Sequence, residues 1–179
     1  MKTTMLLTVV LAIATPASAQ VSPYAQEPSR ELQALSDEEV ASLLEGAGMG
    51  FARAAELNGV PGPRHSLDMA DQLELDDMQR ARLQDVFARM NARARELGSA
   101  IIARERALDT AFASGAATAE EVEQETLAIA LLYGRLRAVH LLAHLETMEI
   151  LTPHQSARYA QLRGYADASA AAGDHGAHH

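Results

Sequence analysis

Two histidines four residues apart are the side chains of this sequence best suited to chemistry. His140 and His144 fall within a predicted helix, where this spacing places both imidazole rings on one side and lets them chelate a single ion. Met148 follows one turn later. Imidazole suits zinc, nickel and copper, whereas a thioether would favour copper(I). Two ligands do not complete a tetrahedral site, so the alternative is two histidines bordering an apolar face beside a core methionine.

The C-terminal residues contain a second group of histidines, His175, His178 and His179. A short histidine-rich end can bind divalent metal ions without a fold. The alternatives are an inert soluble terminus or a cloning remnant. Of the remaining histidines, His65 follows a rigid turn and could reach the helices, whereas we expect His154 to be an exposed residue.

Catalytic motifs are missing from the sequence. It has no His-Glu-x-x-His pair, no nucleophile elbow and no cysteine. We therefore expect a binding protein, not an enzyme, with no organic cofactor and at most a copper, zinc or nickel ion. Asp76 and Asp77 are better explained by helix capping than by acid–base chemistry.

The first 19 residues have the pattern of a secretory signal peptide. Lys2 precedes a short apolar run, Met5–Thr15, and Ala17–Ala19 is a small-residue cleavage site. The cysteine-free remainder suits a bacterial periplasm, and we expect no later stretch to span a membrane. Without the leader, 14 arginines stand against 24 acidic residues, a net charge of −10 that argues against a nucleic-acid partner.

The histidines and their surroundings must be positioned by helices, because apolar residues recur every three or four positions. The longest helix is predicted over residues 77–113, roughly 55 Å at about 1.5 Å per residue. Asp76 is its N-cap, and Gln79 can return the capping hydrogen bond. A second long helix begins after Thr118 and runs to about Ile150.

Shorter helices flank the long ones. Ser36 opens a helix that continues to the turn at 58–63, interrupted by Gly46, Gly48 and Gly50. A phosphate-binding loop is rejected because no strand precedes the glycines, so close approach of another helix is the favoured explanation. A short helix is predicted over 66–73.

The last helix has its own start signal. It begins with Thr152 as N-cap, Pro153 at the first position and Gln155 closing the capping box, and it ends near Gly164. We expect one all-α domain over residues 35–165, disorder over 20–34 and a disordered tail over 166–179.

The second long helix is apolar on two sides, although a two-layer arrangement requires only one. The second side therefore predicts contact with another partner, and a second copy of the chain is the obvious candidate. One side contains Leu127, Leu131, Leu141, Leu142 and Leu145, and the other contains Ile129, Leu132, Leu136, Val139 and Ile150.

The starts of two helices resemble a known family motif. Leu151–Gln155 matches the L-T-x-x-Q motif of the Spy/CpxP-like periplasmic proteins, and Leu75–Gln79 looks like a second copy in which Asp76 replaces threonine. The resemblance covers roughly residues 35–165. It implies a thin, curved homodimer built on a long antiparallel helical hairpin with short flanking helices. For chaperone members it also implies a concave face that holds partly unfolded proteins.

Four arginines of the first long helix offer a surface compatible with that role. They lie in a narrow arc beside its apolar stripe, where cations could hold acidic, apolar segments in solution. The alternative is a solvated face with pairs within the helix, such as Arg89 with Asp85 and Arg93 with Glu96. The four are Arg82, Arg89, Arg93 and Arg104.

The sequence and the resemblance together favour a periplasmic protein of envelope or heavy-metal stress that binds transition-metal ions, unfolded proteins, or both. One alternative is an ATP-independent holdase whose histidines are incidental. Another is a regulatory module that contacts a membrane-bound sensor kinase or an anti-sigma factor.

Overall fold

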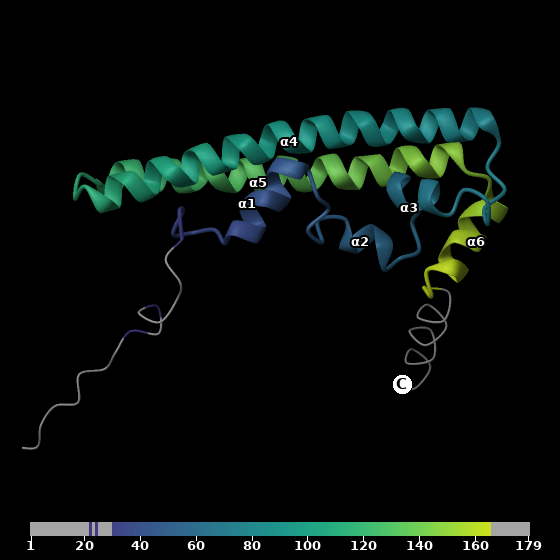
Figure 1. Ribbon diagram of the computed structural model, residues 1–179, viewed down its shortest axis with the longest axis horizontal. Coiled ribbons are helices and arrows are strands. Elements are labelled where there is room, and N and C mark those ends of the chain that lie inside the picture. Colours follow the sequence, from purple (N-terminus) through teal and green to yellow (C-terminus); the bar gives the residue numbers. More distant parts are fainter. Residues whose placement is uncertain (1–21, 23, 25–29, 166–179) are drawn as a thin grey trace, which may run out of the picture.

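A computed structural model of the 179-residue chain describes residues 22, 24 and 30–165. The predicted signal peptide and C-terminal tail lie outside the described residues, as do His175, His178 and His179. The described residues form six helices and no strand (Figure 1), as the all-α prediction required. The helices are α1 Asp37–Glu45, α2 Arg53–Glu56, α3 Pro63–Asp68, α4 Asp77–Ala113, α5 Ala119–Ile150 and α6 Pro153–Leu162.

Helices α4 and α5, the long helix pair, pack along each other and form the axis of the molecule (Figure 1). Their bounds agree with the prediction because each begins at a complete capping box, Asp76 with Gln79 and Thr118 with Glu121. In the connecting turn, Gly115 adopts the left-handed conformation (φ 70°) that glycine tolerates at little cost.

The helix predicted from Ser36 to the turn at 58–63 is broken into α1 and α2. Gly46 ends α1 in the left-handed conformation, and Met49 and Gly50 also have positive φ. Three left-handed residues within five positions cannot belong to an α-helix, so the prediction of a continuous helix was wrong.

Close approach of another helix explains only one of the three glycines. A Cβ at Gly46 would lie 2.8 Å from Nδ2 of Asn91 in α4, whereas Gly48 and Gly50 face open space. The tightest approach occurs instead at Gly98 of α4, where a Cβ would lie 2.2 Å from the carbonyl oxygen of Leu43. Gly98 therefore lets α1 lie directly on α4.

The flanking helices divide the core into two clusters along the long helix pair. The cluster beside α3 and α6 contains Leu73, Leu83 and Tyr159, and the cluster beneath α1 contains Leu43, Ile101 and Leu136. Leu32 belongs to the second cluster, although residues 20–34 were expected to be disordered. Helix α3 begins three residues earlier than predicted because Pro63 occupies its first turn.

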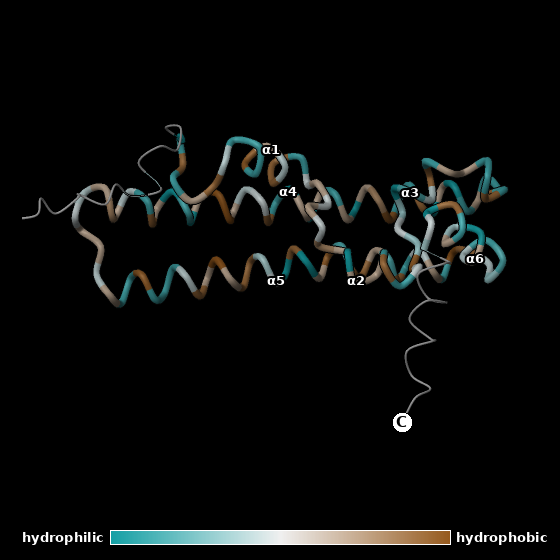
Figure 2. Tube along the Cα trace, turned by 90° about the horizontal axis from the view of Figure 1, so that it is seen from below, coloured by the Kyte–Doolittle hydropathy of each residue, from teal (hydrophilic) through white to brown (hydrophobic). Residues whose placement is uncertain are grey.

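The two apolar sides of α5 have different environments. Ile129, Leu136 and Ile150 are buried, whereas Leu131 and Leu145 are more than half exposed. Apolar segments recur along the whole of α5 in Figure 2, from the turn to its C-terminal end. The described residues therefore leave one apolar face of α5 without a partner.

Helix α5 is also long and apolar enough, by length and composition alone, to cross a membrane. The expectation that no stretch after the leader is apolar enough to cross a membrane was therefore wrong. Helix α5 nevertheless packs along α4 and carries buried polar residues, including Thr147. The core helix of a water-soluble protein passes the same test, so the prediction that the protein is not membrane-embedded stands as a prediction.

Candidate functional site

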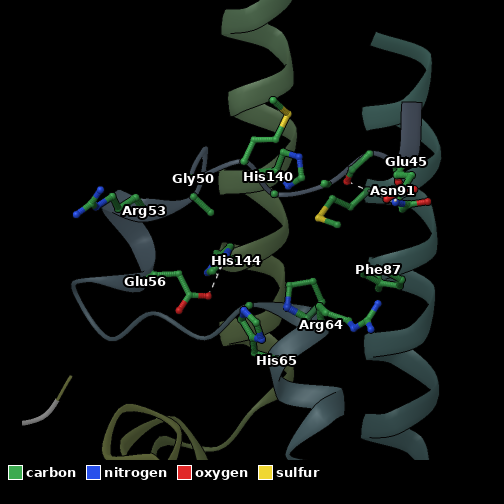
Figure 3. A pocket seen from close by; sticks show the side chains of 18 of the residues that line it. Glu45, Gly50, Arg53, Glu56, Arg64, His65, Phe87, Asn91, His140 and His144 are labelled. Carbon is green, nitrogen blue, oxygen red and sulfur yellow. Dashed lines mark hydrogen bonds and ion pairs between the residues drawn. The ribbon is translucent and has the colours of Figure 1, made fainter. Parts of the chain in front are cut away.

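A cavity of about 500 Å³ lies between the long helix pair and the segment that runs from the end of α1 to α3 (Figure 3). Helix α5 contributes His140 and His144, α2 contributes Glu56, and α3 contributes His65. We call this cavity the histidine pocket. It contains both histidines of α5 that were predicted to chelate a metal ion, and it adds two side chains that are distant in sequence.

His144 is held in one tautomer. Its Nδ1 lies 3.0 Å from the carbonyl oxygen of Val60, and a carbonyl can only accept, so Nδ1 carries the proton. The lone pair is then on Nε2, which lies 3.8 Å from Oε1 of Glu56. Burial lowers the pKa of His144, and the bond to Val60 and the Glu56 charge offset part of this effect. The ring is therefore neutral at pH 7.

The fit around His144 requires a glycine at position 62. A Cβ on Gly62 would lie 2.6 Å from Cε1 of the imidazole and 2.7 Å from its Nε2. The residue that follows, Pro63, starts α3 and fixes the backbone at this point. The turn between α2 and α3 thus both binds Nδ1 and leaves space for the ring.

His140 lies one turn before His144 and is only 4% exposed. Its ring stacks on Phe51, with 5.7 Å between ring centroids. Burial lowers the pKa of His140, and the neighbouring His144 lowers it further. Its Nε2 is buried without a hydrogen-bond partner. Buried polar atoms are rarely left unpaired, so this nitrogen is a candidate ligand atom.

Glu56 connects the pocket to the end of α6. Its carboxylate accepts hydrogen bonds from the hydroxyls of Tyr159 (3.0 Å to Oε1) and Tyr165 (2.8 Å to Oε2), and Nη2 of Arg163 lies 3.4 Å from Oε2. Burial raises the pKa of both tyrosines, so both hydroxyls keep their protons and donate. A partly buried carboxylate is thus held by three donors beside a neutral imidazole.

The remaining candidate ligands are less well placed. Met148 is 47% exposed and is not part of the pocket lining, so the structure does not bring it to the two histidines. His154 is exposed, as expected. In the part of the chain that the structure describes, no three His, Cys, Asp or Glu side chains are arranged to hold a metal ion. The pocket therefore offers two imidazoles but not a complete site made by protein side chains.

Sequence reasoning missed Glu56 as a site residue. It lies 88 residues before His144 and in no motif, and only the turn at 57–62 brings α2 against α5. His65 was noted as able to reach the helices, and it does line the pocket. Its position after Pro63 was the only available signal.

The four arginines proposed to bind unfolded proteins are exposed on α4, and three of them form ion pairs. Arg89 pairs with Asp85 and Glu146, Arg93 with Glu96, and Arg104 with Glu125. The pairs of Arg89 with Asp85 and of Arg93 with Glu96 were the expected alternative. Arg82 lines a shallow cavity of about 200 Å³ together with Arg89. Most of this positive charge is therefore balanced locally.

The two copies of the capping motif meet in space. Nε2 of Gln79 donates to Oε1 of Gln155 (2.8 Å), and Nε2 of Gln155 lies 3.0 Å from Oε1 of Gln79. The same amides reach the carbonyl oxygens of Ile150 and Leu73. We call this pair the glutamine clasp. Asp76 and Thr152 serve as the N-caps that hold the two glutamines in register.

No protein-family model, no curated protein and no solved structure matches this chain. The resemblance to the Spy/CpxP-like proteins therefore rests on the two capping motifs and the order of the helices.

Proposed function

We propose that this protein is a non-catalytic binding protein of the bacterial periplasm whose histidine pocket takes up a transition-metal ion. The observation that carries the proposal is the pair of buried, neutral imidazoles of His140 and His144 in one cavity. A buried ring whose Nδ1–H is held by a backbone carbonyl is the usual form of a metal-binding histidine, because that bond fixes the ring and its tautomer.

The chemistry of the donors favours zinc, nickel or copper over magnesium or calcium, which prefer oxygen ligands. Because both rings lose their protons below the usual pH range of histidine, an ion need not displace a proton at neutral pH. Ligands beyond the two imidazoles would come from water, a bound anion or other residues of the pocket. No organic cofactor is part of the proposal.

The physiological setting follows from the leader-like residues 1–19 and the resemblance to the Spy/CpxP-like proteins. In that setting the protein would act in envelope or heavy-metal stress. It would form a thin, curved homodimer in which the long helix pair is the antiparallel hairpin of each subunit. The C-terminal histidines 175, 178 and 179 would add weak metal binding of their own.

Calorimetric titration of Zn(II), Ni(II), Cu(II) and Cu(I) into the purified protein tests the proposal. The variant His140→Ala/His144→Ala removes both candidate ligands, and His154→Ala is the matched control because His154 is exposed on α6. A third variant replaces His175, His178 and His179 by alanine to remove the tail contribution.

We expect submicromolar binding of at least one ion that survives the tail substitutions and the control but disappears in the double variant. Binding that disappears with the tail substitutions alone would reduce His140 and His144 to packing residues. Absence of binding in the unmodified protein would reject the metal function.

A second candidate function, an ATP-independent holdase, is favoured by the exposed apolar face of α5. Exposed leucines over several helical turns form the kind of surface that binds apolar segments. Suppression of client aggregation, measured by light scattering with and without the His140→Ala/His144→Ala changes, separates the two functions. A holdase would protect clients equally in both proteins. Contact with a membrane-bound sensor kinase or anti-sigma factor remains a third prediction, testable by co-purification from membranes.

A further inference from the structure

We infer that Glu56 is a ligand of the bound ion and that the end of α6 positions it, so that the metal site includes a carboxylate controlled by Tyr165 and Arg163. This inference rests on the proposed metal-binding function and deepens it. It starts from the contact between Nε2 of His144 and Oε1 of Glu56. Val60 fixes the His144 ring on one side of this contact, and Tyr159 holds Glu56 on the other.

The separation of the two atoms suits a shared ion. Zinc–nitrogen and zinc–oxygen bonds are about 2.0–2.2 Å long, which places two ligand atoms of a regular tetrahedral site about 3.4 Å apart. The atoms Nε2 of His144 and Oε1 of Glu56 are 3.8 Å apart. An ion between them therefore requires a closing movement of only a few tenths of an ångström or a modest widening of one angle.

The tautomer of His144 leaves Nε2 free to bind an ion. Since Nδ1 of His144 donates to Val60, Nε2 is the only nitrogen of that ring that can bind an ion. The same Nε2 is the atom nearest to the Glu56 carboxylate. His140, one turn away with an unpaired Nε2, supplies a further imidazole from the same helix. Because no three His, Cys, Asp or Glu side chains of the described residues already surround one point, binding of an ion would draw Glu56 towards the two imidazoles and supply the oxygen ligand that they lack.

The two oxygens of Glu56 have different partners. Oε2 is held by Tyr165 (2.8 Å) and faces Arg163 (3.4 Å), whereas among the described residues only Tyr159 donates a hydrogen bond to Oε1 (3.0 Å). The hydroxyl of Tyr159 is also 3.1 Å from Oε2. When an ion takes Oε1, this hydroxyl can donate to Oε2 alone, so the carboxylate keeps its anchors. Tyr165 and Arg163 are therefore positioning residues, not ligands.

The charges support the same assignment. A nearby anion stabilises a buried divalent ion, and the Glu56 carboxylate lies against the His144 ring, 3.8 Å from its Nε2. Arg163 balances the charge of the Glu56 carboxylate. A bound ion would balance part of the Glu56 charge itself. The contacts of Tyr165 and Arg163 with Glu56 would therefore differ between the metal-free and the metal-bound protein.

The experiment is a Zn(II) titration of the full chain carrying alanine at positions 175, 178 and 179. Glu56→Gln removes the carboxylate, and Glu38→Gln is the matched control because Glu38 is exposed on α1 outside the pocket and loses the same charge. We expect affinity to fall at least about tenfold for Glu56→Gln and to change less than about twofold for the control. Tyr165→Phe should give an intermediate loss, and Co(II) spectra should differ between Glu56→Gln and the parent.

Equal affinities of the two glutamine variants, in a parent that binds Zn(II), would overturn the inference and leave the proposed function standing. A parent that binds no ion overturns both. Should Glu56→Gln fail to fold by circular dichroism, the ring signals of Tyr159 and Tyr165 in carbon NMR spectra decide. Shifts that saturate with one equivalent of Zn(II) and vanish in His140→Ala/His144→Ala support the inference, and unchanged signals reject it.

Discussion

We expect two buried histidines to make the stability of this protein depend on pH. Burial lowers the pKa values of His140 and His144 in the folded chain, whereas in the unfolded chain both titrate near about 6.5. Below that pH the unfolded state binds more protons than the folded state. Stability contributed by the neutral rings is therefore complete above about pH 6.5 and is lost as the pH falls towards the folded-state values.

We predict a lower urea midpoint at pH 5 than at pH 7.5 in metal-free protein. The expected slope is up to about 1.4 kcal/mol per pH unit for each histidine within this window. His140→Phe, which keeps an aromatic ring against Phe51, should reduce the dependence, and the exposed control His154→Ala should not. If the urea midpoint depends on pH equally in His140→Phe and in the unmodified protein, groups other than His140 cause the dependence.

The hydrogen bonds of the glutamine clasp should also contribute to stability. Gln155 is buried and serves Leu73, Glu74 and Gln79 through one amide nitrogen. Gln155→Ala should cost about 1–3 kcal/mol, because it leaves buried carbonyl oxygens unpaired.

A double-mutant cycle with Gln79→Ala, followed by urea unfolding, should give a coupling energy of about 0.5–3 kcal/mol. Thr118→Ala removes the cap of α5 without touching the clasp and serves as the control. Additive effects of Gln79→Ala and Gln155→Ala would contradict the coupling. The sequence predicted both glutamines as local caps, but their contact, 76 residues apart, depends on tertiary structure that capping patterns do not encode.

At the scale of elements, a glycine decides how closely two helices approach. A Cβ at Gly98 would collide with the backbone of Leu43, which cannot move without shifting α1. We predict that Gly98→Ala destabilises the fold, although alanine is the better helix former by about 1 kcal/mol. The control is Gly134→Ala in α5, where a Cβ meets open space.

At concentrations where the chain is a monomer, Gly134→Ala should stabilise the protein by roughly 0.5–1 kcal/mol, since only helix propensity changes there. Thermal unfolding followed by circular dichroism measures both variants. A stabilised Gly98→Ala variant would mean that α1 does not lie on α4 in solution.

The bounds of α4, α5 and α6 could be predicted because capping boxes are local and made of adjacent residues. The division of the first predicted helix into α1 and α2 could not be predicted. It depends in part on the positive φ of Met49, a conformation that methionine rarely adopts. Similarly, Gly98 appears in the sequence as an ordinary interruption of a helix. Its role becomes visible only when α1 lies across it.

At the scale of the molecule, the exposed face of α5 has the spacing of a coiled-coil seam. Intervals of four and three alternate along Leu127, Leu131, Gly134, Ala138, Leu141, Leu145 and Met148. All but Leu141 are exposed, and the two small residues near the middle would permit close approach of a partner helix. This pattern supports the proposed pairing of two copies along α5.

We predict that Leu131→Glu weakens the dimer roughly a hundredfold or more, because each interface would bury unpaired charges. Analytical ultracentrifugation over a range of concentrations measures the effect. Thr126→Glu adds the same charge to an exposed position of α5 outside the seam and should leave the association unchanged. If the unmodified protein is a monomer at every concentration, the homodimer is rejected and the face is free for clients.

The far end of the long helix pair stands apart from the rest of the molecule. Residues 103–128 are all described, and none of them is buried. The ion pair of Arg104 with Glu125 is partly exposed and contributes about 1 kcal/mol or less. Amide hydrogens in this region should exchange with solvent through local opening, whereas those around the glutamine clasp should exchange only when the whole domain unfolds. We therefore expect the turn end of the long helix pair, residues 103–128, to open locally while the end that carries the glutamine clasp stays folded.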